Sequence, residues 1–225
     1  MKIVVFGASG PTGLNVVRQA VGRGQQVTAA VRRPDDFPIS DPLLQVVRTD
    51  ARDSDSVAAT IAGQDAVISV LGGNYTLKPV SIFTEGVGNI VRAMALHSVR
   101  RLACVSSVCV AGTAAPGETF LFRTALLPAM LALGRTAYAD MGRMEVAVRN
   151  SGLDWTIVRA SGLFDGATIT DYTLAPSSIP GRYTSRMDLA DALLDATLEN
   201  KFVDTCVDVI TSVGTPRLTD GFRRS

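Results

Sequence analysis

Short apolar runs alternate along the chain with segments of helical periodicity. The run Lys2–Phe6 is almost unbroken and rich in β-branched residues, which is typical of a parallel strand buried on both faces. Between residues 80 and 98, apolar side chains recur with the spacing of one helix face. This pattern predicts strands at 2–6, 26–31, 44–48, 65–71, 101–105, 153–158 and 202–210. It predicts helices at 14–21, 54–62, 80–98 and 185–199, and a helix after residue 135 that continues over 143–150.

The alternation of strands and helices predicts an α/β fold. The 225 residues are enough for one domain with a substantial core, and a content of 47% apolar and 19% charged residues is typical of a globular chain. No internal repeat, linker or low-complexity tract divides the sequence. We therefore expect residues 1–225 to form a single domain.

A glycine-rich turn follows the first strand directly and leads into a helix. The turn is Gly7-Ala8-Ser9-Gly10-Pro11-Thr12-Gly13. Glycine has no side chain to block the approach of a pyrophosphate, and the N-terminus of a helix supplies free N–H groups and the positive end of the helix dipole. Residues 7–13 are therefore a candidate phosphate-binding turn.

The glycine spacing alone is a weak signal. G-x-x-G-x-x-G differs from the commoner G-x-G-x-x-G, and a glycine triplet also suits a tight structural turn. The motif nevertheless ends the first apolar strand and is followed by a second strand at 27–31. This context favours nucleotide binding over a purely structural turn.

Two arginines, Arg32 and Arg33, follow the second strand. In dinucleotide-binding folds an acidic residue at this position favours NAD, because it accepts hydrogen bonds from the ribose 2′-OH, whereas arginine accommodates the 2′-phosphate of NADP. A guanidinium can also pair bidentately with a phosphate. The sequence therefore favours NADP(H), and a solvated loop position is the alternative, more so for Arg33 than for Arg32.

The ends of the third and fourth strands supply further candidate contacts. Asp50, followed by Ala51, is expected at the adenine edge, where its carboxylate can accept from the exocyclic amine or can instead cap the following turn. Leu71 and Gly72 end the fourth strand. A glycine there lets the backbone pass close to the ribose and diphosphate, although a plain loop also uses glycine.

Composition argues against several classes of partner. The chain has 22 basic and 21 acidic residues, so no overall positive field points to nucleic acid. Three cysteines without a C-x-x-C pair, and a single histidine, indicate free thiols and no metal site. The N-terminus begins with a strand, not a signal peptide, and the longest apolar stretch, Ala125–Leu133, is too short to cross a bilayer. We expect a cytoplasmic protein without a membrane partner.

Several motifs together resemble one family. They are GASGPTG, the two arginines, and the runs TDARDSDSVAATIAGQDAVISVLG, RLACVSSV and SGLDWTIVRASGLFDG. Over about residues 1–210 the chain resembles the atypical short-chain dehydrogenases/reductases, in the NAD(P)H-binding group that includes the NmrA-like proteins and biliverdin reductase B. The resemblance implies a doubly wound Rossmann-type sheet with strand order 3-2-1-4-5-6-7 and NADP(H) across the strand ends.

The resemblance also assigns roles at the ends of the fifth and sixth strands. Ser107, beside Ser106, matches the family's active-site serine, whose hydroxyl can bind a substrate oxygen or the nicotinamide amide. Arg159 begins the segment that matches the family's Arg-Pro-Gly loop, with Ala160 in place of proline. We interpret Arg159 as a structural ion-pair residue or as an anchor for cofactor or anionic substrate.

The sequence departs from the family at the usual Tyr-x-x-x-Lys dyad. Tyr138 is followed four residues later by Gly142, and Met141 stands where we align the family lysine. In the family, this lysine lowers the pKa of the tyrosine so that the phenol can exchange a proton with the substrate. Arg143 lies close by but does not exchange protons. Carbonyl reduction by the tyrosine mechanism is therefore not expected.

Two segments are candidates for the substrate side. The stretch 111–135 predicts an apolar helix interrupted by Pro128, which could form a lid, a dimer surface or core, and we favour a lid. Residues 160–185 are expected to form a small substrate-side segment, with a mobile loop at 166–180, and Arg186 and Asp188 resemble a pair that ties it to the sheet. Residues 211–225 form a polar tail.

The sequence supports two functional hypotheses. The first is an NADP(H)-dependent oxidoreductase, monomeric or homodimeric, that passes hydride to a flavin, a quinone or a similar conjugated small molecule, because such acceptors do not need a tyrosine proton donor. The second is a non-catalytic NADP(H) redox sensor of the NmrA-like type. A Rossmann scaffold with an empty site is a third reading, less attractive because the phosphate turn is intact.

Overall fold

The structure is a computed structural model that describes residues 1–73, 79–112, 119–176 and 179–216. Its strands are β1 (Lys2–Phe6), β2 (Gln26–Val31), β3 (Leu44–Arg48), β4 (Ala66–Ser69), β5 (Arg101–Ser107), β6 (Asp154–Ala160), β7 (Gly162–Phe164), β8 (Tyr172–Ala175), β9 (Tyr183–Ser185) and β10 (Thr205–Thr211). Its α-helices are α1 (Pro11–Gly22), α2 (Ser54–Ile61), α3 (Ile82–Leu96), α4 (Leu127–Leu133), α5 (Arg135–Arg149) and α6 (Arg186–Leu198). Every strand and helix predicted from the sequence is present, with small shifts of the ends.

The central sheet has the order β3-β2-β1-β4-β5-β6-β10-β8. The first seven of these strands run parallel, and β10 is the seventh strand of the predicted order 3-2-1-4-5-6-7. The predicted order is thus confirmed. One strand is added beyond it, because β8 pairs antiparallel with the open edge of β10.

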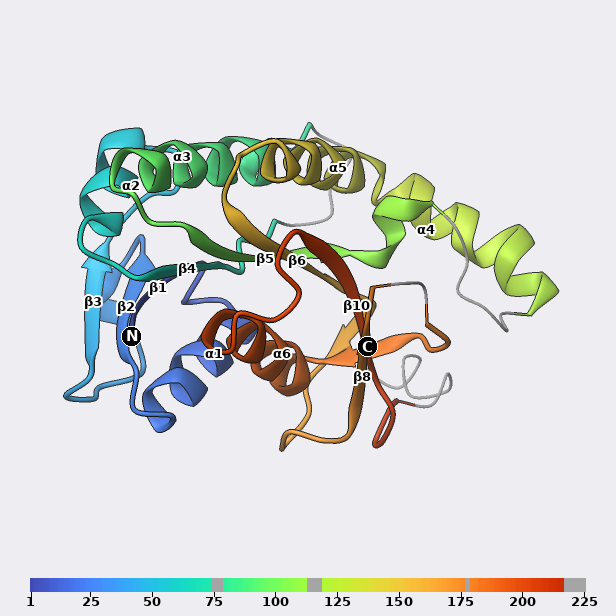
Figure 1. Cartoon of the computed structure of the whole chain (residues 1–225). Helices are drawn as coiled ribbons and strands as arrows, with labels where there is room; N and C mark the ends of the chain where they lie inside the picture. The colour runs from blue at the N-terminus through green and yellow to red at the C-terminus, as the bar shows by residue number, and fades with distance from the viewer. Residues whose placement is uncertain (74–78, 113–118, 177–178, 217–225) are drawn as a thin grey trace.

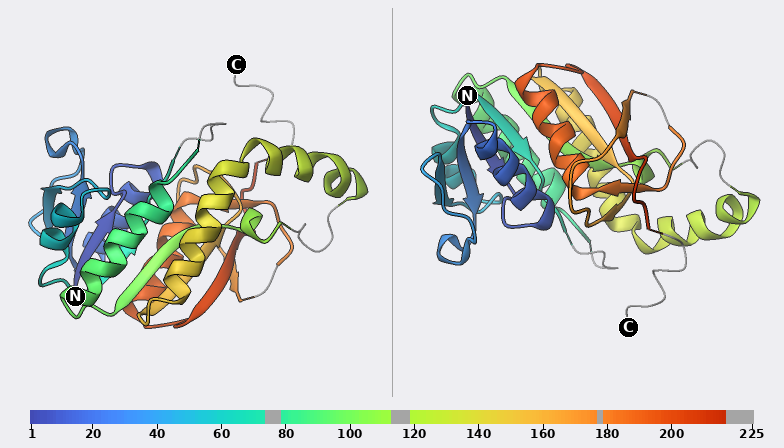
Figure 2. Two further views of the ribbon diagram at one scale, coloured as in Figure 1. Left: turned by 90° about the horizontal axis from the view of Figure 1, so that it is seen from above. Right: turned by 90° about the horizontal axis from the view of Figure 1, so that it is seen from below.

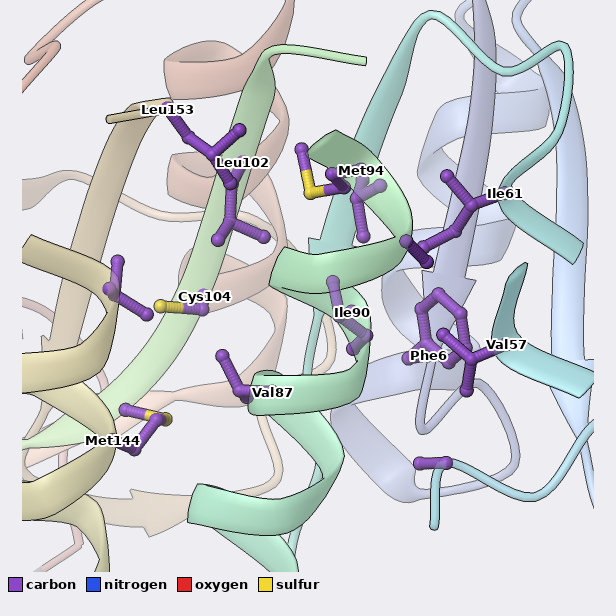
Figure 3. Close-up of a cluster of buried hydrophobic side chains, with 14 of the residues drawn as sticks. Phe6, Val57, Ile61, Val87, Ile90, Met94, Leu102, Cys104, Met144 and Leu153 are labelled. Carbon is purple, nitrogen blue, oxygen red and sulfur yellow. The ribbon is translucent and has the colours of Figure 1, made fainter. Parts of the chain in front are cut away.

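Helices cover both faces of the sheet (Figure 1). α2, α3 and α5 lie on one face, and α1 and α6 lie on the other, as the two views of Figure 2 also show. Side chains alternate along β1, so that Val4 and Phe6 enter the core under α2 and α3 whereas Ile3 and Val5 enter the core over α1 and α6. Figure 3 shows Phe6 beside Val57 and Ile61 in the first of these cores. The doubly wound arrangement follows directly from apolar strands that are buried on both sides.

The expected mobile loop at 166–180 is in part a strand, so that prediction is wrong for its central residues. β8 is hydrogen-bonded to β10, and β7 and β9 form a separate two-stranded sheet. The Thr, Ser and Pro content of the segment concealed β8, because pairing with β10 and not local preference makes it a strand. Residues 177–178 lie outside the described residues, as do residues 217–225 of the expected polar tail.

The C-terminal segment is tied down by Asp188, which is fully buried. Its carboxylate accepts the Thr170 N–H at 2.8 Å and the Thr211 hydroxyl at 2.6 Å. Arg186 pairs instead with Asp165 at 2.9 Å. The two residues predicted as a tying pair therefore hold the segment through separate partners.

The predicted apolar helix within 111–135 is present but is built in two parts. A π-helical turn at Phe122–Leu126 precedes α4, and Pro128 lies in the first turn of α4. A proline at that position needs no intrahelical N–H bond, so it begins a helical segment instead of interrupting one. Residues 113–118 of this stretch lie outside the described residues.

Asp140 of α5 caps the neighbouring helix α3. Its carboxylate is fully buried and accepts the backbone N–H of Phe83 at 2.9 Å, the N–H of Thr84 at 3.4 Å and the Thr84 hydroxyl. Arg143 donates to the same carboxylate at 3.0 Å. Ser81, the N-cap residue of α3, makes no side-chain capping bond, so α5 supplies the cap that α3 lacks.

We predict that Asp140→Ala lowers the free energy of unfolding by about 2–4 kcal/mol, because it leaves buried donors without an acceptor. Asp140→Asn keeps one acceptor oxygen and is expected to lose less. Urea unfolding followed by circular dichroism measures both variants. Equal stability of Asp140→Ala and the wild type would show that this cap contributes nothing.

Candidate functional site

The site residues predicted from the sequence lie together at the carboxyl ends of the strands, which we call the carboxyl edge of the sheet. Because the strands are parallel, their carboxyl ends lie side by side in the order β3, β2, β1, β4, β5, β6. The edge therefore presents, in this order, Asp50 and Ala51, Arg32 and Arg33, the turn 7–13, Leu71 and Gly72, Ser106 and Ser107, and Arg159. Ligands of such sheets bind at this edge, where the strand order reverses, and here the reversal falls between β1 and β4.

Two of the three turn glycines are required by the packing of the fold. Gly7 has φ +79°, and a Cβ there would lie 2.5 Å from the Val70 carbonyl oxygen at the end of β4. A Cβ at Gly13 would lie 2.7 Å from Ala8 Cα and closer still to the Gly7 oxygen. These glycines let β1, β4 and α1 approach one another at the reversal point.

Gly10 differs, because the protein itself leaves room for a side chain. Its φ is −75°, which any residue adopts, and the nearest atom to an added Cβ is the Gly7 oxygen at 3.4 Å. Gly10 is the N-cap of α1, no side chain caps the helix, and Pro11 begins it. The first N–H groups of α1 thus have no side-chain acceptor. The space beside them, which a Cβ at Gly10 would fill, is open, and a bound phosphate needs both features.

The remaining turn residues divide between core and surface. Ala8 is fully buried in the core over α1 and α6. Ser9 is exposed and Thr12 is half-buried. Two hydroxyls therefore accompany the N–H groups of α1 at the turn, and both types of group bind phosphate oxygens.

The two arginines after β2 have different surroundings. Arg33 forms an exposed pair with Asp36 at 3.4 Å. Arg32 is also exposed, and no ion pair or side-chain hydrogen bond is recorded for it within the described part of the chain. Arg32 is therefore the guanidinium with its donors available for a 2′-phosphate.

Of the site residues after β3 and β4, Ala51 and Leu71 contact α3, whereas Asp50 is bonded within its own turn. Asp50 accepts the Arg52 N–H at 3.0 Å, which is the turn-capping alternative, and its side chain remains exposed. The Ala51 carbonyl accepts from the buried Asn89 side chain at 2.8 Å. A Cβ at Gly86 of α3 would lie 2.7 Å from Leu71, so this glycine gives Leu71 its place at the edge.

A buried carboxylate, Glu145, organises the ends of β5 and β6. Its side chain is 3% exposed and accepts the Ser106 hydroxyl at 2.7 Å and two bonds from Arg159 at 2.9 and 2.6 Å. Arg149 adds a fourth bond at 3.0 Å. The hydrogen bond to Glu145 raises the pKa of Arg159. Of the two roles considered for Arg159, the geometry displays the structural ion pair.

Ser106 and Ser107 point to opposite faces of β5, as neighbouring strand residues do. The Ser106 hydroxyl is buried and committed to Glu145. Ser107 is half-buried, and its Oγ accepts the Cys109 N–H at 3.2 Å, which leaves its own proton to donate. The hydroxyl able to face a ligand is therefore that of Ser107.

The region of the expected dyad contains no lysine. Tyr138 is half-buried, and its ring packs where a side chain at Gly134 would stand, while Met141 packs against the core under α3 and α5. Of the two described lysines, Lys2 begins β1 and Lys201 pairs with Glu199, both away from the carboxyl edge. Lys78 lies outside the described residues.

Aromatic and cationic side chains gather on the substrate-side segment. Arg182 lies over the Phe122 ring at 4.8 Å, and Phe164 meets Tyr183 edge to face with ring centroids 6.3 Å apart. Arg182 and Tyr183 also line a hollow of about 370 Å³ beside the end of β10. The segment thus carries two aromatic contacts, one on each side of the extended run that contains Arg182 and Tyr183.

The cysteines form no cluster with other ligating groups. All three are free, and burial raises the pKa of the Cys104 thiol, so that it stays protonated. Among the described residues, no group of three or more His, Cys, Asp or Glu side chains is placed to hold a metal ion.

The fold and the turn after β1 define a dinucleotide-binding protein of the Rossmann type. The model of the NAD(P)H-binding family matches residues 7–200, and the chain belongs to that family. An uncharacterized chloroplastic protein of Arabidopsis thaliana is 31% identical over 228 residues, which is 96% of this chain and 79% of that protein.

Solved structures show the same fold at lower identity. A short-chain dehydrogenase/reductase of Veillonella parvula, in complex with NADP, has a TM-score of 0.78 and 18% identity, with 95% of each chain covered. ChuY, an anaerobillin reductase of Escherichia coli O157:H7, has a TM-score of 0.76 and 20% identity and covers 96% of this chain and 100% of its own. At these identities the two neighbours show that the chain shares their fold.

Two residues that position the site, Asn89 and Glu145, were not predicted from the sequence. Asn89 lies within the apolar face of α3, and a lone polar residue on such a face is the signal that would have found it. Glu145 has no such signal for its place in the site, because Arg159 and Ser106 are 14 and 39 residues away in the chain. Only the packing of α5 on β5 and β6 brings them together.

The different surroundings of the glycines lead to a paired prediction. Gly10→Ala is expected to leave the free energy of unfolding within about 1 kcal/mol and to weaken NADPH binding roughly tenfold or more, because the methyl group occupies the cradle. Gly13→Ala is expected to cost roughly 1–3 kcal/mol of stability through overlap with Ala8 and Gly7. Thermal unfolding and calorimetric titration separate the two effects. Unchanged NADPH affinity in Gly10→Ala would contradict the assignment of the turn.

Proposed function

We propose that the protein is an NADP(H)-dependent oxidoreductase that passes hydride to a conjugated acceptor such as a flavin, a quinone or a tetrapyrrole. The observation that carries the proposal is the turn at Gly10, whose free backbone donors and open cradle suit a pyrophosphate. Membership of the NAD(P)H-binding family supports it, as does the reductase among the structural neighbours.

The edge residues have distinct roles in this proposal. The turn 7–13 holds the pyrophosphate, Arg32 holds the 2′-phosphate, and Ala51, Leu71 and Gly72 line the adenosine half. The bound cofactor supplies the hydride. Ser107 orients the reacting end through its hydroxyl proton, while Ser106, Glu145 and Arg159 fix the backbone beneath it.

The acceptor class follows from the departure from the family's Tyr-x-x-x-Lys sequence. Met141 and Gly142 stand at the positions aligned with the family lysine, so the sequence does not offer the lysine that the family's carbonyl mechanism uses. A conjugated acceptor stabilises the added electrons itself and takes its proton from solvent. The aromatic side chains of the substrate-side segment, among them Tyr183 beside the hollow at the end of β10, are consistent with such a planar acceptor.

The preference for NADP is tested by comparing the two arginines. Arg32→Ala is expected to weaken NADP binding by roughly 1.5–3 kcal/mol and to leave NAD binding nearly unchanged, because a charge-assisted hydrogen bond is lost only with the 2′-phosphate. Arg33→Ala is the matched control, since Arg33 already pairs with Asp36. Calorimetric titration with both cofactors measures the effect, and equal weakening of NADP and NAD by Arg32→Ala would refute the assignment.

Turnover is tested by NADPH oxidation with FMN, a soluble quinone and biliverdin as acceptors. We expect activity with at least one of them, and a loss of about tenfold in turnover for Ser107→Ala with NADPH affinity retained. The absence of NADPH oxidation above background with all three acceptors would contradict the enzymatic proposal.

A redox sensor is the second candidate, favoured by the same absence of lysine at positions 141 and 142. A sensor must respond to the oxidation state of its ligand, so it predicts clearly different affinities for NADP and NADPH, or a partner whose binding depends on which is bound. Equal affinities together with measurable turnover decide in favour of the enzyme.

A further inference from the structure

An apolar helical arm, residues 119–134, extends from the body of the protein. In Figure 1 and in both views of Figure 2, α4 reaches past the edge of the sheet. Five large apolar side chains of the arm are exposed, by 82, 71, 46, 39 and 66% for Phe120, Leu121, Leu126, Met130 and Leu133. Soluble monomers rarely expose so many adjoining apolar side chains without a partner.

The arm is apolar on nearly all its sides. Leu127 is buried and Leu131 is half-buried, and they face the protein. Leu126, Met130 and Leu133 follow one another at spacings of four and three residues and form an outer row, and exposed alanines cover the rest of α4. From 124 to 134 the sequence has no charged residue. A helix that is apolar all round belongs in an apolar surrounding, not against a partner that covers a single face.

The charges that flank the arm are positive and available. Arg123 and Arg135 are exposed, and no ion pair or side-chain hydrogen bond is recorded for either within the described residues. The sequence from Thr119 to Ala139 holds these two arginines and no acidic residue. Apolar surface between free cations complements an anionic lipid surface.

We propose that the arm docks the protein on an anionic lipid surface, with α4 lying at the boundary between headgroups and acyl chains and with Arg123 and Arg135 at the lipid phosphates. At this depth the outer row of Leu126, Met130 and Leu133 enters the acyl boundary, while the two guanidinium groups reach the lipid phosphates. The expectation of no membrane partner was based on the length of the apolar stretch 125–133. A stretch of that length is too short to cross a bilayer, but it can lie on a bilayer surface. No helix within the described ranges is long and apolar enough to cross.

Docking through the arm would also fix the orientation of the protein. Phe122, near the N-terminal end of the arm, lies under the Arg182 guanidinium of the substrate-side segment. The lipid surface would therefore lie near that segment, while the glycine turn remains part of the main body. The inference depends on the arm alone and does not require the proposed acceptor.

Co-sedimentation with vesicles tests the proposal directly. The wild-type chain is expected to sediment with vesicles of phosphatidylcholine and phosphatidylglycerol and less with pure phosphatidylcholine. Leu126→Glu combined with Leu133→Glu is expected to weaken binding by about tenfold or more, because two carboxylates then oppose entry into the anionic layer. Leu96→Glu is the matched control, since Leu96 is exposed by 71% at the end of α3, and it is expected to bind like the wild type.

Other outcomes overturn the proposal. A wild-type chain that stays in the supernatant with anionic vesicles contradicts it, as does equal loss of binding in the Leu96→Glu control. A wild-type dimer that the arm variant dissociates, without vesicle binding by either, assigns the arm to a second copy. Circular dichroism shows whether the arm variant is folded, and NADPH titration of the wild type separates failure of lipid docking from failure of the cofactor assignment.

Discussion

The close approach of backbone to backbone at the turn after β1 is the constraint on which the site depends. Gly7 turns the chain against the Val70 carbonyl, and Gly13 brings α1 against Ala8. Any side chain at either position would push β1, β4 and α1 apart at the point where the strand order reverses. The same contact aims the N-terminus of α1 at the space above Gly10, so the architecture of the fold and its phosphate-binding geometry arise from one local structure.

A second constraint governs the other half of the edge. The buried carboxylate of Glu145 binds Ser106, Arg149 and Arg159 through charge-assisted hydrogen bonds, with Arg149 on the exposed side. Removal of one partner would leave charge buried without compensation, which is why such clusters hold their members in fixed positions. Ser107 stands one residue beyond this cluster and shares its rigidity without sharing its hydrogen bonds. This part of the site thus combines a rigid hydrogen-bonded cluster around Glu145 with a Ser107 hydroxyl that can still donate its proton.

Local patterns were sufficient to predict what local sequence determines. β1, β2 and β3 have the predicted bounds, because short, mostly apolar runs between turn residues leave few alternatives. β8 could not be predicted, because its strand character comes from pairing with β10 about 35 residues later in the chain. The sequence could not decide whether Arg159 forms a structural ion pair or anchors a ligand, because its partner Glu145 lies on a different element. The exposure of the arm likewise depends on the direction of α4 relative to α5, which cannot be predicted from the spacing of apolar residues.

The central claim is that the edge of the sheet holds NADP(H), and the most direct measurement is calorimetric titration of the purified protein with NADPH, NADP, NADH and NAD at one salt concentration. The account predicts saturable binding of the two 2′-phosphorylated cofactors and much weaker binding of NADH and NAD, because Arg32 offers a partner only to the 2′-phosphate. Absence of binding for all four would reduce the glycine turn to architecture and contradict the functional account.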